Sequence, residues 1–106
     1  LMNVGVNYLR EHVTSDVRMH YMTEVSGAPN IVPDKASVLY TIRALTRKGV
    51  EDAYERVNDC ARGAALMTGT KVRIEFLSGC YPTNANKVFS MVMDEALREV
   101  GWDIWT

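Results

Sequence analysis

Residues 28–43, APNIVPDKASVLYTIR, decide the fold of this chain. A turn braced by Pro29 and Pro33 leads into a segment in which apolar and polar side chains alternate, as is typical of a β-strand. The turn carries Asn30, and the strand ends at Arg43. We expect the strand to hold these two residues at a fixed separation, at which an amide and a guanidinium could contact one small anion. The pair therefore predicts recognition of a carboxylate.

The same alternation occurs on both sides of this stretch. It predicts strands over residues 16–25, 35–44 and 70–78, each with one apolar and one polar side. In the first of these strands the drier side holds Val17, Met19 and Tyr21, and the other side holds Arg18, His20, Met22 and Glu24. Residues 26–34 contain a glycine and two prolines, so they are expected to form a shaped connection between the first two strands.

Apolar residues that recur every three or four positions predict helices over about residues 1–13, 48–67 and from residue 83 or 84 to Gly101. The order helix, strand, strand, helix, strand, helix predicts an α+β fold, with helices on one face of an antiparallel sheet. It matches a ferredoxin-like (split βαβ) sandwich that lacks its first strand. In that fold the first strand lies between the third and the fourth. Residues 70–78 would therefore need another pairing partner.

Length and charge exclude several classes of protein. With 106 residues, 47% of them hydrophobic, we expect one compact domain. Twelve basic residues against thirteen acidic ones give a net charge of −1, and the basic residues are scattered. We therefore expect no nucleic-acid partner and no membrane partner, because both need a concentrated positive charge or a long apolar run.

The cysteines and histidines do not form a metal site or a disulfide framework. Cys60 and Cys80 are twenty residues apart without a CxxC spacing, and only His12 and His20 could join them as ligands. We expect two reduced thiols and a cytoplasmic location. His20 stands alone on a strand face, which favours a packed or half-exposed histidine over a ligand or base. No catalytic residue and no metal ligand is predicted in this chain.

Three runs resemble the lid, or dimerisation, domain of the aminoacylase and carboxypeptidase family of two-metal amidohydrolases. They are LMNVGVNYLREHV (1–13), DVRMHYMTEVSGAPNIVPDKASVLYTIRA (16–44) and YERVNDCARGAALMTGTKVRIEF (54–76). The resemblance implies that residues 1–82 are an N-terminally truncated lid domain. It also implies that residues 83–106 are a return segment toward a catalytic domain outside this sequence.

The resemblance also implies an activity for the parent protein, which would hydrolyse N-acyl or aminobenzoyl amino acids. The missing catalytic domain would hold two divalent metal ions, zinc or manganese, so the fragment alone is expected to be inactive. Asn30 and Arg43 match the family's lid residues that hold the carboxylate of an acidic amide substrate. The family's lid histidine lies outside this sequence, and His20 does not take its place.

The resemblance further implies a homodimer, for which we expect residues 16–25 to provide the self-associating edge. Other interpretations stay open. Arg43 could pair with a surface acid such as Glu24, and Asn30 could be a turn residue that satisfies its own backbone. The chain could also be a stand-alone ferredoxin-like module that binds a small acid or oligomerises, or a purely structural dimerisation unit.

Overall fold

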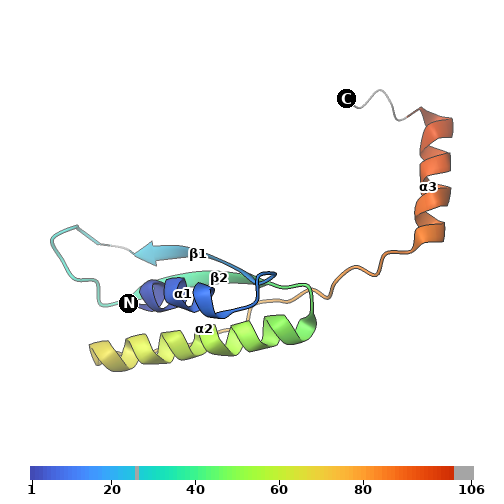
Figure 1. The fold of residues 1–106 in the computed structure, drawn as a ribbon. Helices are drawn as coiled ribbons and strands as arrows, with labels where there is room; N and C mark the ends of the chain where they lie inside the picture. Colours follow the sequence, from blue (N-terminus) through green and yellow to red (C-terminus); the bar gives the residue numbers. More distant parts are fainter. Residues whose placement is uncertain (26, 102–106) are drawn as a thin grey trace.

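The computed structural model describes residues 1–25 and 27–101 and confirms the α+β class. Figure 1 shows the helices and the hairpin of strands in chain order. The elements are α1 (Met2–Leu9), the short 3-10 helix η1 (Arg10–His12), β1 (Arg18–Val25), β2 (Ala36–Arg43), α2 (Arg47–Thr68) and α3 (Lys87–Val100). None of the helices in the described ranges is long and apolar enough to cross a bilayer.

β1 and β2 form an antiparallel hairpin along their whole length. Arg18 lies opposite Arg43 at one end, and Val25 lies opposite Ala36 at the other. Within the described ranges the sheet contains these two strands. Since side chains alternate along a strand, the register divides the hairpin into two faces of different character.

The inner face of the hairpin packs against α1 and α2. One buried cluster joins side chains from the two helices, from β1 and from the residue before it: Val6, Leu9, Val17, Met19, Ala53 and Val57. Val17 and Met19 are buried, as the alternation predicts, and Tyr40 and Ile42 of β2 pack against the cluster. The expectation of helices on one face of the sheet therefore holds for α1 and α2 (Figure 1).

α2 is defined by its two ends and by one apolar side. The hydroxyl of Thr46 accepts a hydrogen bond from the Gly49 amide at 3.1 Å, so the helix starts at a capped residue. It ends at Gly69, whose φ of 64° is left-handed and suits a residue without a Cβ. Its buried side chains are Ala53, Val57, Asn58 and Ala61, of which Ala53 and Val57 belong to the core cluster.

The strand expected over residues 70–78 is not formed, because residues 70–86 belong to no helix or strand. A strand needs a neighbour to complete its hydrogen bonds, and neither β1 nor β2 pairs with this segment. The segment instead contacts α2. The ring of Phe76 meets that of Tyr54 edge-on at 6.1 Å, and Arg47 lies over the ring of Tyr81 at 5.4 Å.

α3 stands apart from the rest of the described chain (Figure 1). Asn86 caps the helix by accepting from the Phe89 amide at 3.0 Å, so it begins at Lys87, later than the position expected from the sequence. None of its residues is buried. The radius of gyration is 20.5 Å, whereas a compact chain of this length would have about 13 Å. The chain is therefore not packed as the single compact body expected from its composition.

Candidate functional site

Arg43 lies at the end of β2 on the face of the hairpin that the helices do not cover. We call this surface the outer face. It consists of the alternate residues Arg18, His20, Met22 and Glu24 of β1 and Ser37, Leu39, Thr41 and Arg43 of β2, all of which are exposed. The alternation of side chains along each strand determines which residues belong to the inner face and which to the outer face. The sequence pattern therefore predicted correctly on which side Arg43 and His20 lie.

The pairs across the outer face change in character along the hairpin. Arg18 faces Arg43, so one end carries two guanidinium groups. His20 faces Thr41 next to them. The last two pairs are Met22 with Leu39, and Glu24 with Ser37. The outer face therefore runs from a cationic end, through hydrogen-bonding groups, to an apolar pair and a single carboxylate.

The open interpretation in which Arg43 pairs with Glu24 is wrong in this structure. Glu24 lies at the other end of the hairpin, where its Oε2 accepts a hydrogen bond from the hydroxyl of Ser37 at 3.0 Å. Within residues 1–25 and 27–101 the ion pairs involve other arginines, and Arg43 has no carboxylate partner there. Its guanidinium is thus open to a ligand from solvent or from another chain.

Asn30 lies in the loop at the opposite end of the hairpin from Arg43. The amide of Ile31 donates to the carbonyl of Ala28 at 3.0 Å, which closes a turn around Pro29 and Asn30. Figure 1 shows this loop projecting beyond the sheet. β2 alone, with eight residues, spans about 23 Å. The structure therefore does not bring Asn30 and Arg43 together on one small anion within a single chain, contrary to the expectation from their spacing.

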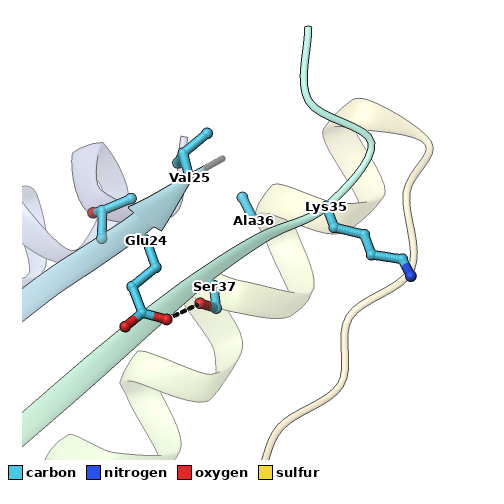
Figure 2. A pocket seen from close by; sticks show the side chains of 6 residues that line it. Glu24, Val25, Lys35, Ala36 and Ser37 are labelled. Atoms are coloured by element: carbon cyan, nitrogen blue, oxygen red, sulfur yellow. Dashed lines mark hydrogen bonds between the residues drawn. The ribbon is translucent and has the colours of Figure 1, made fainter. Parts of the chain in front are cut away.

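A shallow hollow of about 560 Å³ lies where the hairpin opens toward this loop (Figure 2). It is lined by Thr23, Glu24, Val25, Lys35, Ala36 and Ser37. Glu24 and Ser37 are joined by their hydrogen bond, and Lys35 extends away from them. The hollow holds one carboxylate that is already hydrogen-bonded, which is too little for acid–base chemistry or metal binding.

A second hollow, of about 330 Å³, lies between η1 and the start of α2. His12, Lys48, Asp52 and Arg56 are among its lining residues. Arg56 donates to the His12 carbonyl at 2.7 Å and lies 3.7 Å from a carboxylate oxygen of Asp52. Its cation is therefore already engaged in joining η1 to α2, and we assign it a structural role.

The described ranges contain no group of three or more His, Cys, Asp or Glu side chains that could hold a metal ion. Cys60 and Cys80 are both free thiols. Cys60 packs beside the core against α1, and burial raises the pKa of its thiol, which favours the unreactive protonated form. His20 is exposed on the outer face rather than packed, and its cross-strand neighbour is Thr41.

Arg18 is the residue of this surface that sequence reasoning missed. Alternation placed it on the polar side of β1, but its position opposite Arg43 depends on how the two strands align. A connection as long as residues 26–35 does not fix that alignment in the way that a two-residue turn does.

The chain is similar in sequence to part of one amide hydrolase and of two dipeptidases. The chain is 40% identical over 107 aligned positions to a subunit of the p-aminobenzoyl-glutamate hydrolase of Escherichia coli, covering 99% of the chain and 22% of that protein. It is 33% identical to the Xaa-Arg dipeptidase of Mus musculus over 71% of the chain and 18% of that protein. The human Xaa-Arg dipeptidase is 29% identical over 67% of the chain and 16% of that protein.

The chain thus spans about a fifth of the length of the curated relatives it matches. No family profile matches it, and no solved structure matches it. The aligned region includes both strands of the hairpin and the loop between them, because the first relative aligns along nearly the whole chain.

Proposed function

Since the chain corresponds to a segment of the aminoacylase and carboxypeptidase family of amidohydrolases, we propose that it is the lid and dimerisation domain of a metal-dependent hydrolase. The parent protein hydrolyses N-acyl or p-aminobenzoyl amino acids, such as aminobenzoyl-glutamate. In this proposal residues 1–82 are the lid, and residues 83–106 return toward the catalytic domain. The fragment alone is inactive.

The observation that carries the proposal is the uncovered outer face with Arg43 at its end. A guanidinium presents a planar pair of donors that matches the two oxygens of a carboxylate. Arg43 is exposed and has no acidic partner in the described ranges, so this match is available to a substrate. Holding the carboxylate fixes the amide bond relative to the attacking water and lowers the entropic part of the barrier.

The hydrolysis itself would use groups outside this chain. Two divalent metal ions, zinc or manganese, would activate the attacking water in the catalytic domain. The described residues of the chain do not fit such a centre, because they offer no cluster of ligands. We therefore assign to this chain only the binding and orientation of the substrate.

The length of the hairpin places a condition on Asn30. Asn30 and Arg43 lie at opposite ends of the hairpin, so one carboxylate can contact both only if they come from different copies of the chain. A homodimer formed through the open edge of β1 would satisfy this condition, since an antiparallel edge can pair with its own copy across a two-fold axis. In this proposal Asn30 of one protomer orients a substrate held by Arg43 of its partner.

The finer fold, a ferredoxin-like sheet, is also a proposal. β2 has a second open edge, and residues 71–76 alternate charged and apolar side chains while lying beside α2. A strand inserted between β2 and residues 71–76 would complete a four-stranded sheet and supply the hydrogen bonds that this segment lacks. Free Cys60 and Cys80 are consistent with the reducing cytoplasm that we propose as the location.

The test is to replace Arg43 by alanine in the full-length enzyme and to compare two matched amides. One carries the free carboxylate of the amino acid, and the other carries a neutral carboxamide in its place. We expect Arg43→Ala to lower kcat/KM for the acid by roughly a hundredfold and for the carboxamide by much less, because one charge-assisted pair is lost. Arg62→Ala, at an exposed arginine of α2 that pairs with Asp59, is the control. Equal losses on both amides would contradict the proposal.

A further inference from the structure

The register of the hairpin places Arg18 of β1 directly opposite Arg43 of β2. Residues opposed in this way have Cβ atoms about 5 Å apart on the same face of the sheet. Both arginines are exposed on the outer face. Two like charges in this arrangement repel each other. An anion that contacts both guanidinium groups would offset that repulsion.

No carboxylate within the described ranges neutralises the pair. The ion pairs there involve Arg47, Arg56, Arg62, Arg73 and Arg98. A hydrogen bond with Thr14 is the main cause that lowers the pKa of Asp16, and the attraction of nearby Arg18 adds a smaller contribution. Its Oδ2, however, accepts a hydrogen bond from the Leu45 amide at 3.0 Å, and the two residues form no ion pair.

Arg18 is held in place by the loop before β1. Its Nη1 donates to the carbonyls of Ser15 and Val17, the latter at 3.0 Å. A guanidinium has five N–H donors, so Nε and Nη2 are left for a ligand. The anchoring lowers the entropy that this long side chain would otherwise lose when an anion binds.

Beyond the two arginines the outer face continues with groups that suit the rest of an acylated amino acid. His20 and Thr41 form the next pair and offer hydrogen bonds. Met22 and Leu39 follow, with 56% and 46% of their surface exposed. They provide an apolar patch against which an aromatic or aliphatic acyl group can rest. The order of these pairs gives the face a direction. The carboxylates of a ligand would lie at Arg18 and Arg43, and its acyl group would lie at Met22 and Leu39.

We infer that Arg18 is a specificity-determining residue that binds a second carboxylate beside the one held by Arg43, so that the site favours amides of dicarboxylic amino acids. This inference rests on the proposed function of Arg43. Two guanidinium groups on neighbouring strands can each take one carboxylate of a glutamyl or aspartyl group, whereas a neutral side chain leaves one of them unpaired.

The experiment uses the full-length enzyme and two substrates of nearly equal shape, an N-acyl-glutamate and the corresponding N-acyl-glutamine. We expect Arg18→Gln to lower kcat/KM for the glutamate substrate by roughly tenfold or more, mainly through KM, and to change the glutamine substrate by less than about twofold. Arg18→Lys keeps the charge and should retain part of the preference for glutamate over glutamine. Partial retention would show that Arg18→Gln acts through a lost contact with the ligand and not through a misfolded loop.

Two further variants keep the two proposals separate. Arg43→Gln should lower kcat/KM for both substrates, because both carry the carboxylate that Arg43 holds. Arg62→Gln, an exposed arginine of α2 that pairs with Asp59, should change neither. If Arg18→Gln weakens both substrates equally or leaves both unchanged, the inference about Arg18 is overturned while the role of Arg43 stands. If Arg43→Gln affects neither substrate, the proposed function itself fails.

Free glutamate and glutamine are not themselves hydrolysed, so their inhibition constants report binding alone. Glutamate should inhibit the wild-type enzyme more strongly than glutamine, and Arg18→Gln should remove most of that difference. A wild-type enzyme that binds both amino acids equally would also overturn the inference.

Discussion

The hydroxyl of Tyr40 on β2 donates a hydrogen bond to Oδ1 of Asn3 on α1 at 2.7 Å. The amide group of Asn3 in turn donates to the hydroxyl of Thr23 on β1 at 3.0 Å. One side chain of the first helix therefore joins both strands of the hairpin. This contact holds the inner face against α1 and leaves the outer face free for a ligand.

The same tyrosine makes the free energy of unfolding depend on pH in the alkaline range. Burial, with the nearby groups of Tyr21 and Cys60, raises the pKa of Tyr40 to about 12 from an ordinary value of 10.0. Between these pH values the unfolded chain loses the proton while the folded chain keeps it. The free energy of unfolding should therefore fall as pH rises from about 10 to about 12.

Tyr40→Phe should be less stable than the wild type at neutral pH, by about 1 kcal/mol for the lost hydrogen bond. It should also lose less stability through the alkaline range, so the difference between the two proteins narrows. Urea unfolding at several pH values measures both effects. Tyr8→Phe, on an exposed part of α1, should follow the wild type throughout. A constant gap between Tyr40→Phe and the wild type would contradict the linkage.

The two faces of β1 can be compared with one residue type. Met19 faces the core and is 2% exposed, whereas Met22 lies on the outer face. Met19→Ala should reduce the free energy of unfolding by about 2 to 5 kcal/mol, because it leaves a cavity among packed side chains. Met22→Ala should change it by no more than about 0.5 kcal/mol. Chemical denaturation of the two variants distinguishes this arrangement from one in which both faces are covered.

The local patterns of the sequence predicted the hairpin well, including the side on which each residue lies. Val17 and Met19 are buried and Arg18 and His20 are exposed, because the two-residue period of a strand is a local property. The alignment of the strands is not local. It determines which residues face Arg43, and only the structure shows that Arg18 does.

The expected strand over residues 70–78 shows the other limit of local patterns. Its alternation is clear, yet a strand exists only where a neighbour accepts its hydrogen bonds. Within the described ranges that neighbour is absent, and the segment packs beside α2 through Phe76 instead. Periodicity predicts what a segment can form, and its surroundings decide whether it does.

The candidate site shows how an extended chain separates residues. Asn30 and Arg43 are close in sequence and were expected to meet on one anion. A strand advances about 3.3 Å per residue, so the same β2 that links them keeps them apart within one chain. The residue that does lie beside Arg43 is Arg18, which is much farther away in sequence.

The cap of α2 should matter for global stability. Thr46 accepts a hydrogen bond from the Gly49 amide, and α2 supplies buried residues such as Ala53 and Val57 to the core. Thr46→Ala should therefore reduce the free energy of unfolding by about 1 kcal/mol. Thr46→Ser keeps the accepting hydroxyl and should stay close to the wild type. A Thr46→Ser variant as unstable as Thr46→Ala would show that the methyl group, rather than the cap, is responsible.

The cap of α3 should behave differently in the isolated chain of 106 residues. Asn86 makes the equivalent hydrogen bond to the Phe89 amide, but no residue of α3 is buried, so the helix is not coupled to the core. A helix of this length is marginal without packing. Asn86→Ala should therefore speed amide hydrogen exchange within α3 and leave both the protection of α2 and the midpoint of global unfolding unchanged. A lowered midpoint would mean that α3 packs against the core in solution, contrary to the separation seen in the structure.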